Sequence, residues 1–293
     1  MTEEKDTETL KKFRAFMQTL PLVGKHFEDR PKVAVIRLSG IIADSRRRNT
    51  ISYPRYAKLI EKAFEKSGVV AVALAINSPG GSAGQSALVA GLIRQMAEEK
   101  DIPVYAFVED IAASGGYWLA CASDEIYAQS VSLVGSIGVI SAGFGLDQFI
   151  ERHGISRRLH TAGRDKSLLD PFLPEKSEDV ERLQAIQKDL HNIFIDWVRE
   201  RRGHMLKAAD RTIFEGRIWT AQTALELGLI DGLRDMRSFM QQKFGDRVKF
   251  VDISDESRFF PLSYPMSRMD LSGIGDDLVE TLEARALWGR YGL

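Results

Sequence analysis

Residues 69–82, with the sequence VVAVALAINSPGGS, decide the fold class of this 293-residue chain. The first eight are apolar without interruption, which is typical of a strand buried on both faces of a parallel sheet. A turn with two glycines follows, and a helix is expected from there to about residue 99. The strand is preceded by a predicted helix at 53–66 and by another apolar run at 33–38. Strand, helix and strand in this order predict the right-handed crossover unit of α/β folds.

Residues 111–118, IAASGGYW, repeat this arrangement after the next predicted strand, at 103–108. Ligand-binding loops of α/β folds lie at the carboxyl ends of strands, so the two turns are expected to face one cavity. Ser114 is the candidate nucleophile, and the amides of Gly81 and Gly115 are candidates for stabilising a negatively charged oxygen. Taken alone, the octapeptide is better explained as a helix start with Ser114 as its cap.

The composition, with 44% hydrophobic and 28% charged residues, is that of a folded globular protein. The net charge is −1 and no long run of Lys and Arg occurs, so we expect no nucleic-acid partner. The arginines at 46–48 and 199–202 are interpreted as solvated loop or helix-end charges. The histidines have no metal-ligand spacing, so we expect no metal and no cofactor. The single cysteine, Cys121, is expected to be a buried apolar side chain.

Three parts of the chain are expected: an N-terminal amphipathic helix and linker at 1–31, a catalytic domain at 32–253 and a tail with a short helix at 254–293. The amphipathic helix, at 9–20, is expected to dock on its own domain or on a neighbouring subunit. The tail is expected to pack on a neighbouring subunit, with membrane contact through its aromatic residues as the alternative. The sequence contains neither a secretory signal nor an apolar run of about 18 residues, which favours a cytoplasmic location.

The region after the second turn is predicted to contain short elements and one long helix. Apolar residues along the long helix are interpreted as core and subunit packing. Lys166 lies among small and apolar residues, and by itself it is interpreted as a surface lysine. The predicted elements are strands at 125–128, 131–134 and 156–161, and helices at 146–153 and 175–202.

Four motifs occur together: NSPGG at 77–81, AASGGY at 112–117, VGSIGV at 134–139 and GRDK at 163–166. In order and spacing they resemble the bacterial signal peptide peptidase A family, including its SohB-type members. The segment at 214–231 is similar to the C-terminal segment of that family. The resemblance extends from residue 32 to about residue 253.

This resemblance implies a ClpP/crotonase-like β-α superhelix, and a serine endopeptidase with a Ser-Lys dyad. Ser114 is then the nucleophile, and Lys166, kept neutral by burial, is the general base. Ser136 orients the lysine amine, and Gly81 and Gly115 form the oxyanion hole. The resemblance also implies homo-oligomeric rings or domes, in which serine and lysine come from one chain or from neighbouring chains. Unfolded or membrane-released peptides, such as signal-peptide remnants, are the implied substrates.

Typical members of this family carry an N-terminal membrane anchor, and we expect none from this sequence. We therefore expect a cytoplasmic peptidase, with peripheral contact to the inner membrane as an alternative. An acyl-CoA hydratase or isomerase on the same fold would instead use carboxylates, and near the two turns only Glu109 and Asp110 could supply them. An inactive scaffold is the third alternative, and the retention of all four motifs argues against it.

Overall fold

The computed structural model describes residues 30–45, 50–163, 165–254 and 285–292. The helix expected at 9–20 lies outside these residues, as does most of the tail after residue 254. The expected division of the chain at residues 31 and 253 therefore stays a prediction. Among the described residues, no helix combines the length and the apolar content needed to cross a membrane.

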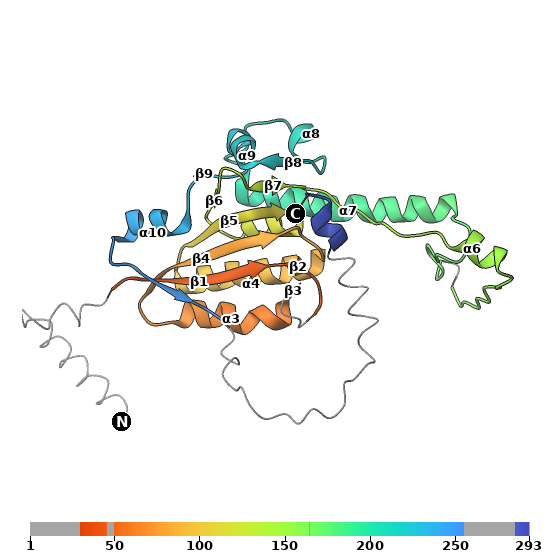
Figure 1. Cartoon of the computed structure of the whole chain (residues 1–293), viewed down its shortest axis with the longest axis horizontal. Coiled ribbons are helices and arrows are strands. Elements are labelled where there is room, and N and C mark those ends of the chain that lie inside the picture. The colour runs from red at the N-terminus through yellow and green to blue at the C-terminus, as the bar shows by residue number, and fades with distance from the viewer. Residues whose placement is uncertain (1–29, 46–49, 164, 255–284, 293) are drawn as a thin grey trace, which may run out of the picture.

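An eight-stranded sheet forms the centre of the molecule (Figure 1). Six of its strands pair in parallel, in the order β10-β1-β4-β5-β6-β9. Strand β7 pairs in parallel with β5 and antiparallel with β8, and β2 and β3 form a small separate sheet. The bounds are β1 Lys32–Ser39, β2 Ile41–Ile42, β3 Thr50–Ile51, β4 Val69–Ser78, β5 Val104–Ala113, β6 Glu125–Ala128, β7 Leu133–Gly135, β8 Ile218–Thr220, β9 Gly232–Leu233 and β10 Lys249–Asp252. The parallel α/β architecture expected from the sequence is confirmed.

Helices cover both faces of this sheet, which explains why its strands are apolar without interruption. In β1, Ala34 and Ile36 belong to the core that α3, α4 and α5 complete. Val33 and Val35 belong to a second core on the opposite face, against α10. The helices are α3 Tyr53–Glu65, α4 Ala83–Lys100, α5 Gly115–Ala120, α6 Asp147–Arg152, α7 Ser177–Arg202, α8 Asp210–Ile213, α9 Ala221–Leu227 and α10 Met236–Phe244.

The chain between β7 and α7 leaves the body of the sheet. Helix α6 and the loops beside it lie beyond the end of the sheet, and α7 extends out to them (Figure 1). The strand expected at 156–161 is wrong, because these residues adopt no regular structure. A short extended segment needs a neighbouring strand to pair with, and the main sheet lies elsewhere. Nine of the twelve large apolar side chains exposed in the described residues lie between 140 and 193, so this extension is apolar on its outside.

Candidate active site

The turn between β4 and α4 is held against β2. The Ile42 amide donates to the Gly80 carbonyl oxygen at 2.9 Å, and the Ser82 amide donates to the Ile42 carbonyl oxygen at 2.8 Å. Gly81 lies between them with φ +141°, and a Cβ there would lie 2.1 Å from the Ile42 oxygen, so only glycine fits. Neither of these hydrogen bonds involves the Gly81 amide. Ser82 caps α4 by accepting from the Gln85 amide at 3.3 Å.

Ser114 lies between the last residue of β5 and the first residue of α5. Its backbone has φ 52° and ψ −121°. Residues other than glycine rarely adopt this backbone conformation, which costs about 1–3 kcal/mol. Although it precedes a helix, its hydroxyl makes no capping hydrogen bond. A simple helix cap therefore does not explain this residue. A serine on a strained strand-to-helix turn is instead typical of an exposed nucleophile.

Strand β5 is longer than the sequence predicts, because it continues beyond residue 108 to Ala113. The additional residues include two acidic ones. In the structure Glu109 pairs with Arg37, and Asp110 accepts a hydrogen bond from the Asn77 side chain at 2.7 Å. These partners allow the strand to carry both carboxylates and to end directly at the Ser114 turn.

The two glycine-bearing turns meet at Ser114, as the sequence predicts. A Cβ built on Gly80 would lie 2.8 Å from the Ser114 Cβ and 2.9 Å from the Gly115 nitrogen. A Cβ built on Gly115 would lie 3.5 Å from the Gly81 nitrogen. The amides of Gly81 and Gly115 are therefore close to one another and to the serine. Gly115 is also the first residue of α5, where an amide has no acceptor within its helix.

Ser136 is beside the same turn. The register of β5 and β7 pairs Ala113 with Gly135, and the Ser114 amide donates to the Gly135 carbonyl oxygen at 2.8 Å. Ser136 follows directly, with φ 54°. Its side-chain oxygen lies 3.3 Å from the Tyr291 hydroxyl, which donates a hydrogen bond to it. Sequence reasoning missed this contact, which connects the tail to the site over 155 residues.

Lys166 is exposed and lies on the extension, away from the turns described above. Its neighbour Asp165 pairs with Arg182 of α7 at 3.1 Å. The part of α7 that lies near Ser114, Leu190 to Phe194, is eight to twelve residues further along, which corresponds to about 12–18 Å of helix. The burial that the resemblance implies for Lys166 is thus absent in the single chain, because the extension packs on little else. The structure brings Ser114, Gly81, Gly115 and Ser136 together and leaves Lys166 apart.

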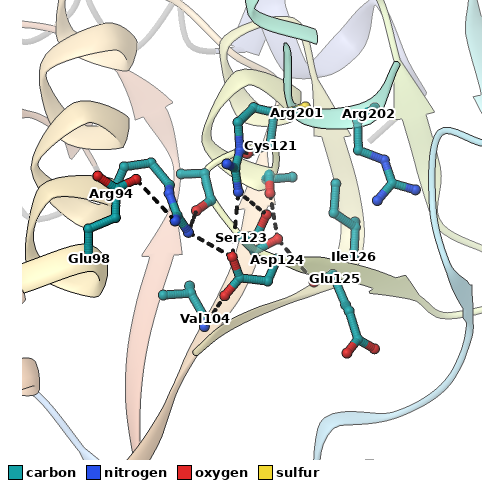
Figure 2. A network of polar contacts seen from close by, with 12 residues as sticks. Arg94, Glu98, Val104, Cys121, Ser123, Asp124, Glu125, Ile126, Arg201 and Arg202 are labelled. Carbon is teal, nitrogen blue, oxygen red and sulfur yellow. Dashed lines mark hydrogen bonds and ion pairs between the residues drawn. The ribbon is translucent and has the colours of Figure 1, made fainter. Parts of the chain in front are cut away.

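The C-terminal end of α7 is fixed to the turn after α5 by a polar network. Figure 2 shows Arg94 of α4 and Arg201 of α7 on two sides of Asp124. The Asp124 carboxylate is 2.8 Å from the Arg94 guanidinium and 3.5 Å from that of Arg201. Arg201 also donates to the carbonyl oxygens of Cys121 and Ser123, at 3.0 and 3.1 Å. The network therefore sets the position of α7 relative to the nucleophile helix.

Arg202 corrects the expectation of solvated charges at 199–202. Its side chain is 3% exposed and pairs with Asp231 through two hydrogen bonds, at 2.8 and 3.1 Å. It also donates to the Gly228 carbonyl oxygen at 3.1 Å. Cys121 is fully buried nearby, as expected, and burial raises the pKa of its thiol to about 12. A thiol that stays protonated is a poor nucleophile, so Cys121 does not compete with Ser114.

A cavity of about 110 Å³ opens beside Ser114. Its polar part includes Ser114 and the two glycines, Gly81 and Gly115. Apolar side chains from α5 and α7 form much of the remaining wall, namely those of Trp118, Leu190 and Phe194. The sequence interpretation favoured core and subunit packing over a binding groove for the apolar residues of α7. Their helical spacing was the available signal, and it does not distinguish a core residue from one that lines a cavity.

Comparison with known proteins agrees with this arrangement. The model of peptidase family S49 matches residues 96–244, just over half of the chain. The match includes the Ser114 turn, Ser136, Lys166 and all of α7.

Three known proteins are similar to this chain in sequence. The Na(+)/H(+) antiporter NhaA of Brucella abortus is 45% identical over 89% of this chain and 37% of its own length. The chloroplastic serine protease SPPA of Arabidopsis thaliana is 33% identical over 89% of this chain and 38% of its own length. Protease 4 of Salmonella typhi is 32% identical over 69% of this chain and 32% of its own length. The chain thus spans less than two-fifths of each relative, and the antiporter's name carries no activity over to it.

Proposed function

The chain belongs to peptidase family S49, and we propose that it is a serine endopeptidase with Ser114 as its nucleophile. The observation that carries this proposal is the position of Ser114 on a strained turn, with the amides of Gly81 and Gly115 beside it. The relative from Arabidopsis thaliana that is named a serine protease supports the same chemistry.

In the proposed reaction, the Ser114 Oγ attacks the peptide carbonyl carbon and its proton passes to the neutral amine of Lys166. The carbonyl oxygen becomes negative and accepts hydrogen bonds from the Gly81 and Gly115 amides. Lys166 then gives the proton to the leaving amine, and an ester remains on Ser114. Water, deprotonated by the same lysine, attacks the ester carbonyl carbon. The bond to the Ser114 Oγ breaks, and the lysine returns the proton to that oxygen as the carboxylic acid leaves. The Ser136 hydroxyl orients the lysine amine during these steps.

We propose that Lys166 acts on Ser114 of a second copy of this chain. A lysine accepts a proton only where burial disfavours its charged form, and Lys166 is exposed in the single chain. The extension that carries it also exposes large apolar side chains, including Phe144, Phe149 and Ile186. Apolar surface of this kind marks an interface. A neighbouring copy seated there would cover the lysine and complete the site, which supports a homo-oligomeric ring or dome.

Unfolded peptides, including remnants of signal peptides, are the proposed substrates. Their support is the resemblance of the four sequence motifs to signal peptide peptidase A, together with the apolar cavity beside Ser114. The hydratase alternative finds less support. Glu109 and Asp110 are engaged by Arg37 and Asn77, and neither carboxylate lines the cavity.

A fluorophosphonate probe tests the proposal, because it forms a covalent adduct with an activated serine. We expect mass spectrometry to locate the adduct on Ser114 in the wild-type protein. The Ser141→Ala variant is the matched control, since Ser141 is exposed on the extension and does not line the Ser114 cavity. It should be labelled like the wild type, whereas Ser114→Ala should not be labelled. An adduct on another serine, or none, would contradict the proposal.

A further inference from the structure

The Tyr117 hydroxyl takes no part in the proposed reaction, although it belongs to the helix that follows the nucleophile. It donates a hydrogen bond of 2.7 Å to the carbonyl oxygen of Leu229, 112 residues further along the chain. We infer that Tyr117 is a positioning residue, whose bond to the turn at 228–231 keeps Ser114 in its strained conformation. The role assigned to Tyr117 rests on the proposed function, since it acts through the same nucleophile.

Tyr117 is linked directly to the backbone of Ser114. Helix α5 has six residues, which make less than two turns, and Tyr117 is the third of them. The Tyr117 amide donates to the Ser114 carbonyl oxygen at 2.9 Å, and the Ser114 amide donates to the Gly135 carbonyl oxygen at 2.8 Å. The serine is therefore held between β7 and Tyr117, and a shift of Tyr117 moves the Ser114 carbonyl group with it.

The conformation of Ser114 also aims the amide that follows it. Because the peptide bond is planar, the ψ angle of Ser114, −121°, sets the direction of the Gly115 N–H. Rotation about this angle would turn the Gly115 N–H away from the neighbouring Gly81 amide, and the two would no longer meet on one oxygen. A strained backbone persists only where the surrounding structure holds it. The hydrogen bond of the Tyr117 hydroxyl is one of the contacts that do so.

The turn at 228–231 is a firm attachment point for this bond. Arg202 donates to the Gly228 carbonyl oxygen at 3.1 Å and pairs with the Asp231 carboxylate at 2.8 Å. That carboxylate accepts a hydrogen bond from the Ile126 amide, and the Asp231 amide donates to the Ile126 carbonyl oxygen, both at 2.7 Å. The turn is therefore fixed both to α7 and to strand β6 of the sheet.

Burial makes the bond difficult to replace. Tyr117 and Leu229 are both 0% exposed. A buried carbonyl oxygen that loses its donor is costly, so we expect the structure around it to shift when the hydroxyl is removed. Burial also raises the pKa of the Tyr117 phenol well above its ordinary value. The hydroxyl therefore stays protonated, and able to donate, at any pH at which the protein is assayed.

Tyr117→Phe tests this role, because it removes the hydroxyl oxygen and keeps the ring. The rate constant for labelling of Ser114 by the fluorophosphonate is measured, together with kcat and KM for an internally quenched apolar peptide. We expect the labelling rate constant and kcat to fall at least about tenfold, since small misplacements at a reacting centre cost large factors in rate. KM should stay within about twofold, because an interaction that acts only in the transition state changes kcat alone.

Tyr56→Phe is the matched control. Tyr56 lies on α3, is 5% exposed and donates to the Arg37 carbonyl oxygen at 2.9 Å. It belongs to the same apolar core as Tyr117 and does not line the Ser114 cavity. Its hydroxyl thus makes the same kind of bond on another helix. We expect a comparable loss of stability in urea, with labelling, kcat and KM unchanged.

A purely structural role for Tyr117 predicts a different result. Both variants would then unfold at lower urea concentrations, and each would label Ser114 at the wild-type rate as long as it is folded. If Tyr117→Phe does not fold, Asp231→Asn decides, because it weakens the attachment of the turn to Arg202 and leaves the Tyr117 hydroxyl in place. It should also slow labelling, and labelling at the wild-type rate would overturn the role of Tyr117.

The possible outcomes separate the two proposals. If the wild type is labelled at Ser114 and Tyr117→Phe is labelled within about twofold of its rate, Tyr117 does not position the serine and the peptidase assignment stands. Equal slowing in Tyr117→Phe and Tyr56→Phe would indicate a general loss of rigidity and would also overturn this role. If the wild type is neither labelled at Ser114 nor cleaves peptides, the proposed function is wrong, and the role of Tyr117 falls with it.

Discussion

The backbone amide of Ser114 donates a hydrogen bond of 2.8 Å to the carbonyl oxygen of Gly135. This bond joins the turn that carries the candidate nucleophile to strand β7, whose next residue is Ser136. Gly135 has φ +118°, and a Cβ there would lie 2.9 Å from the Arg217 carbonyl oxygen and 3.0 Å from the Trp219 ring. The close fit of β7 against β8 therefore keeps Ser114 and Ser136 together.

Gly135→Ala should disturb this fit. The added methyl group must either strain the backbone or push β7 away from β8, which we expect to lower the free energy of unfolding by about 1–3 kcal/mol. Displacing Ser114 should also slow its labelling by fluorophosphonate at least about tenfold, because small misplacements cost large factors in rate. Urea unfolding and labelling rates measure the two effects.

Gly143→Ala is the control for that substitution, since a Cβ on Gly143 would meet nothing within 4 Å. It should leave both quantities unchanged. Labelling of Gly135→Ala at the wild-type rate would mean that the bond to Gly135 does not position Ser114.

A mixing experiment tests whether Lys166 serves a neighbouring chain. Ser114→Ala and Lys166→Ala should each abolish peptide cleavage when purified alone. If each site forms between two copies, subunits co-assembled in equal amounts should regain up to about a quarter of the wild-type activity. An active site then needs a Lys166→Ala chain to supply the serine and a Ser114→Ala neighbour to supply the lysine, and random assembly gives this pair at about a quarter of the sites. Cleavage by the mixed assembly is measured after unfolding and refolding the two variants together.

The same experiment has a clear negative result. If serine and lysine meet within one chain, each chain in the mixture lacks one of them, and the mixture stays inactive. A refolded wild-type sample is the control for the recovery of the assembly.

Local sequence features predicted the centre of this fold well. The uninterrupted apolar run at 69–76, followed by a glycine turn and a helix, indicated a buried parallel strand, because helices cover both faces of such a strand. The glycines at 80 and 81 specified a turn in which backbones approach closely, and a Cβ on either would clash. Both signals lie within a few residues of the structure they encode, and together they led to the cavity beside Ser114.

Features that depend on residues far away in the sequence were not predicted correctly. Arg202 looked like a solvated charge because its partner, Asp231, lies 29 residues further along the chain. The continuation of β5 through Glu109 was not predicted. The residue that pairs with Glu109, Arg37, lies on another strand, so the sequence around residue 109 does not show it. The position of Lys166 depends on how the extension packs, and no local pattern encodes that packing.

Cys121 should resist alkylation in the folded protein. Burial raises its thiol pKa from 9.0 to about 12, so the thiolate is scarce at pH 8 and iodoacetamide cannot reach it. Because the folded protein holds the thiol protonated, this group favours folding below about pH 9, and its contribution falls as the pH rises from there towards 12. Mass spectrometry after iodoacetamide treatment should show modification only when urea is present. Rapid modification of the native protein would contradict the burial of Cys121.

The buried pair of Arg202 and Asp231 should be among the largest polar contributions to the stability of α7. Arg202→Ala would leave the Asp231 carboxylate, whose side chain is 16% exposed, without its cationic partner. Because the loss typically costs about 3–5 kcal/mol at a fully buried site, we expect about 3 kcal/mol here. Arg199→Ala is the matched control, one turn from the same helix end. Its side chain is 48% exposed and pairs with Asp210 at the surface, so we expect a loss of about 1 kcal/mol or less. Urea unfolding measures both changes. Equal losses for the two variants would mean that Asp231 is rehydrated when Arg202 is removed, and that the end of α7 is held mainly by Arg201 and the apolar contacts of Phe194.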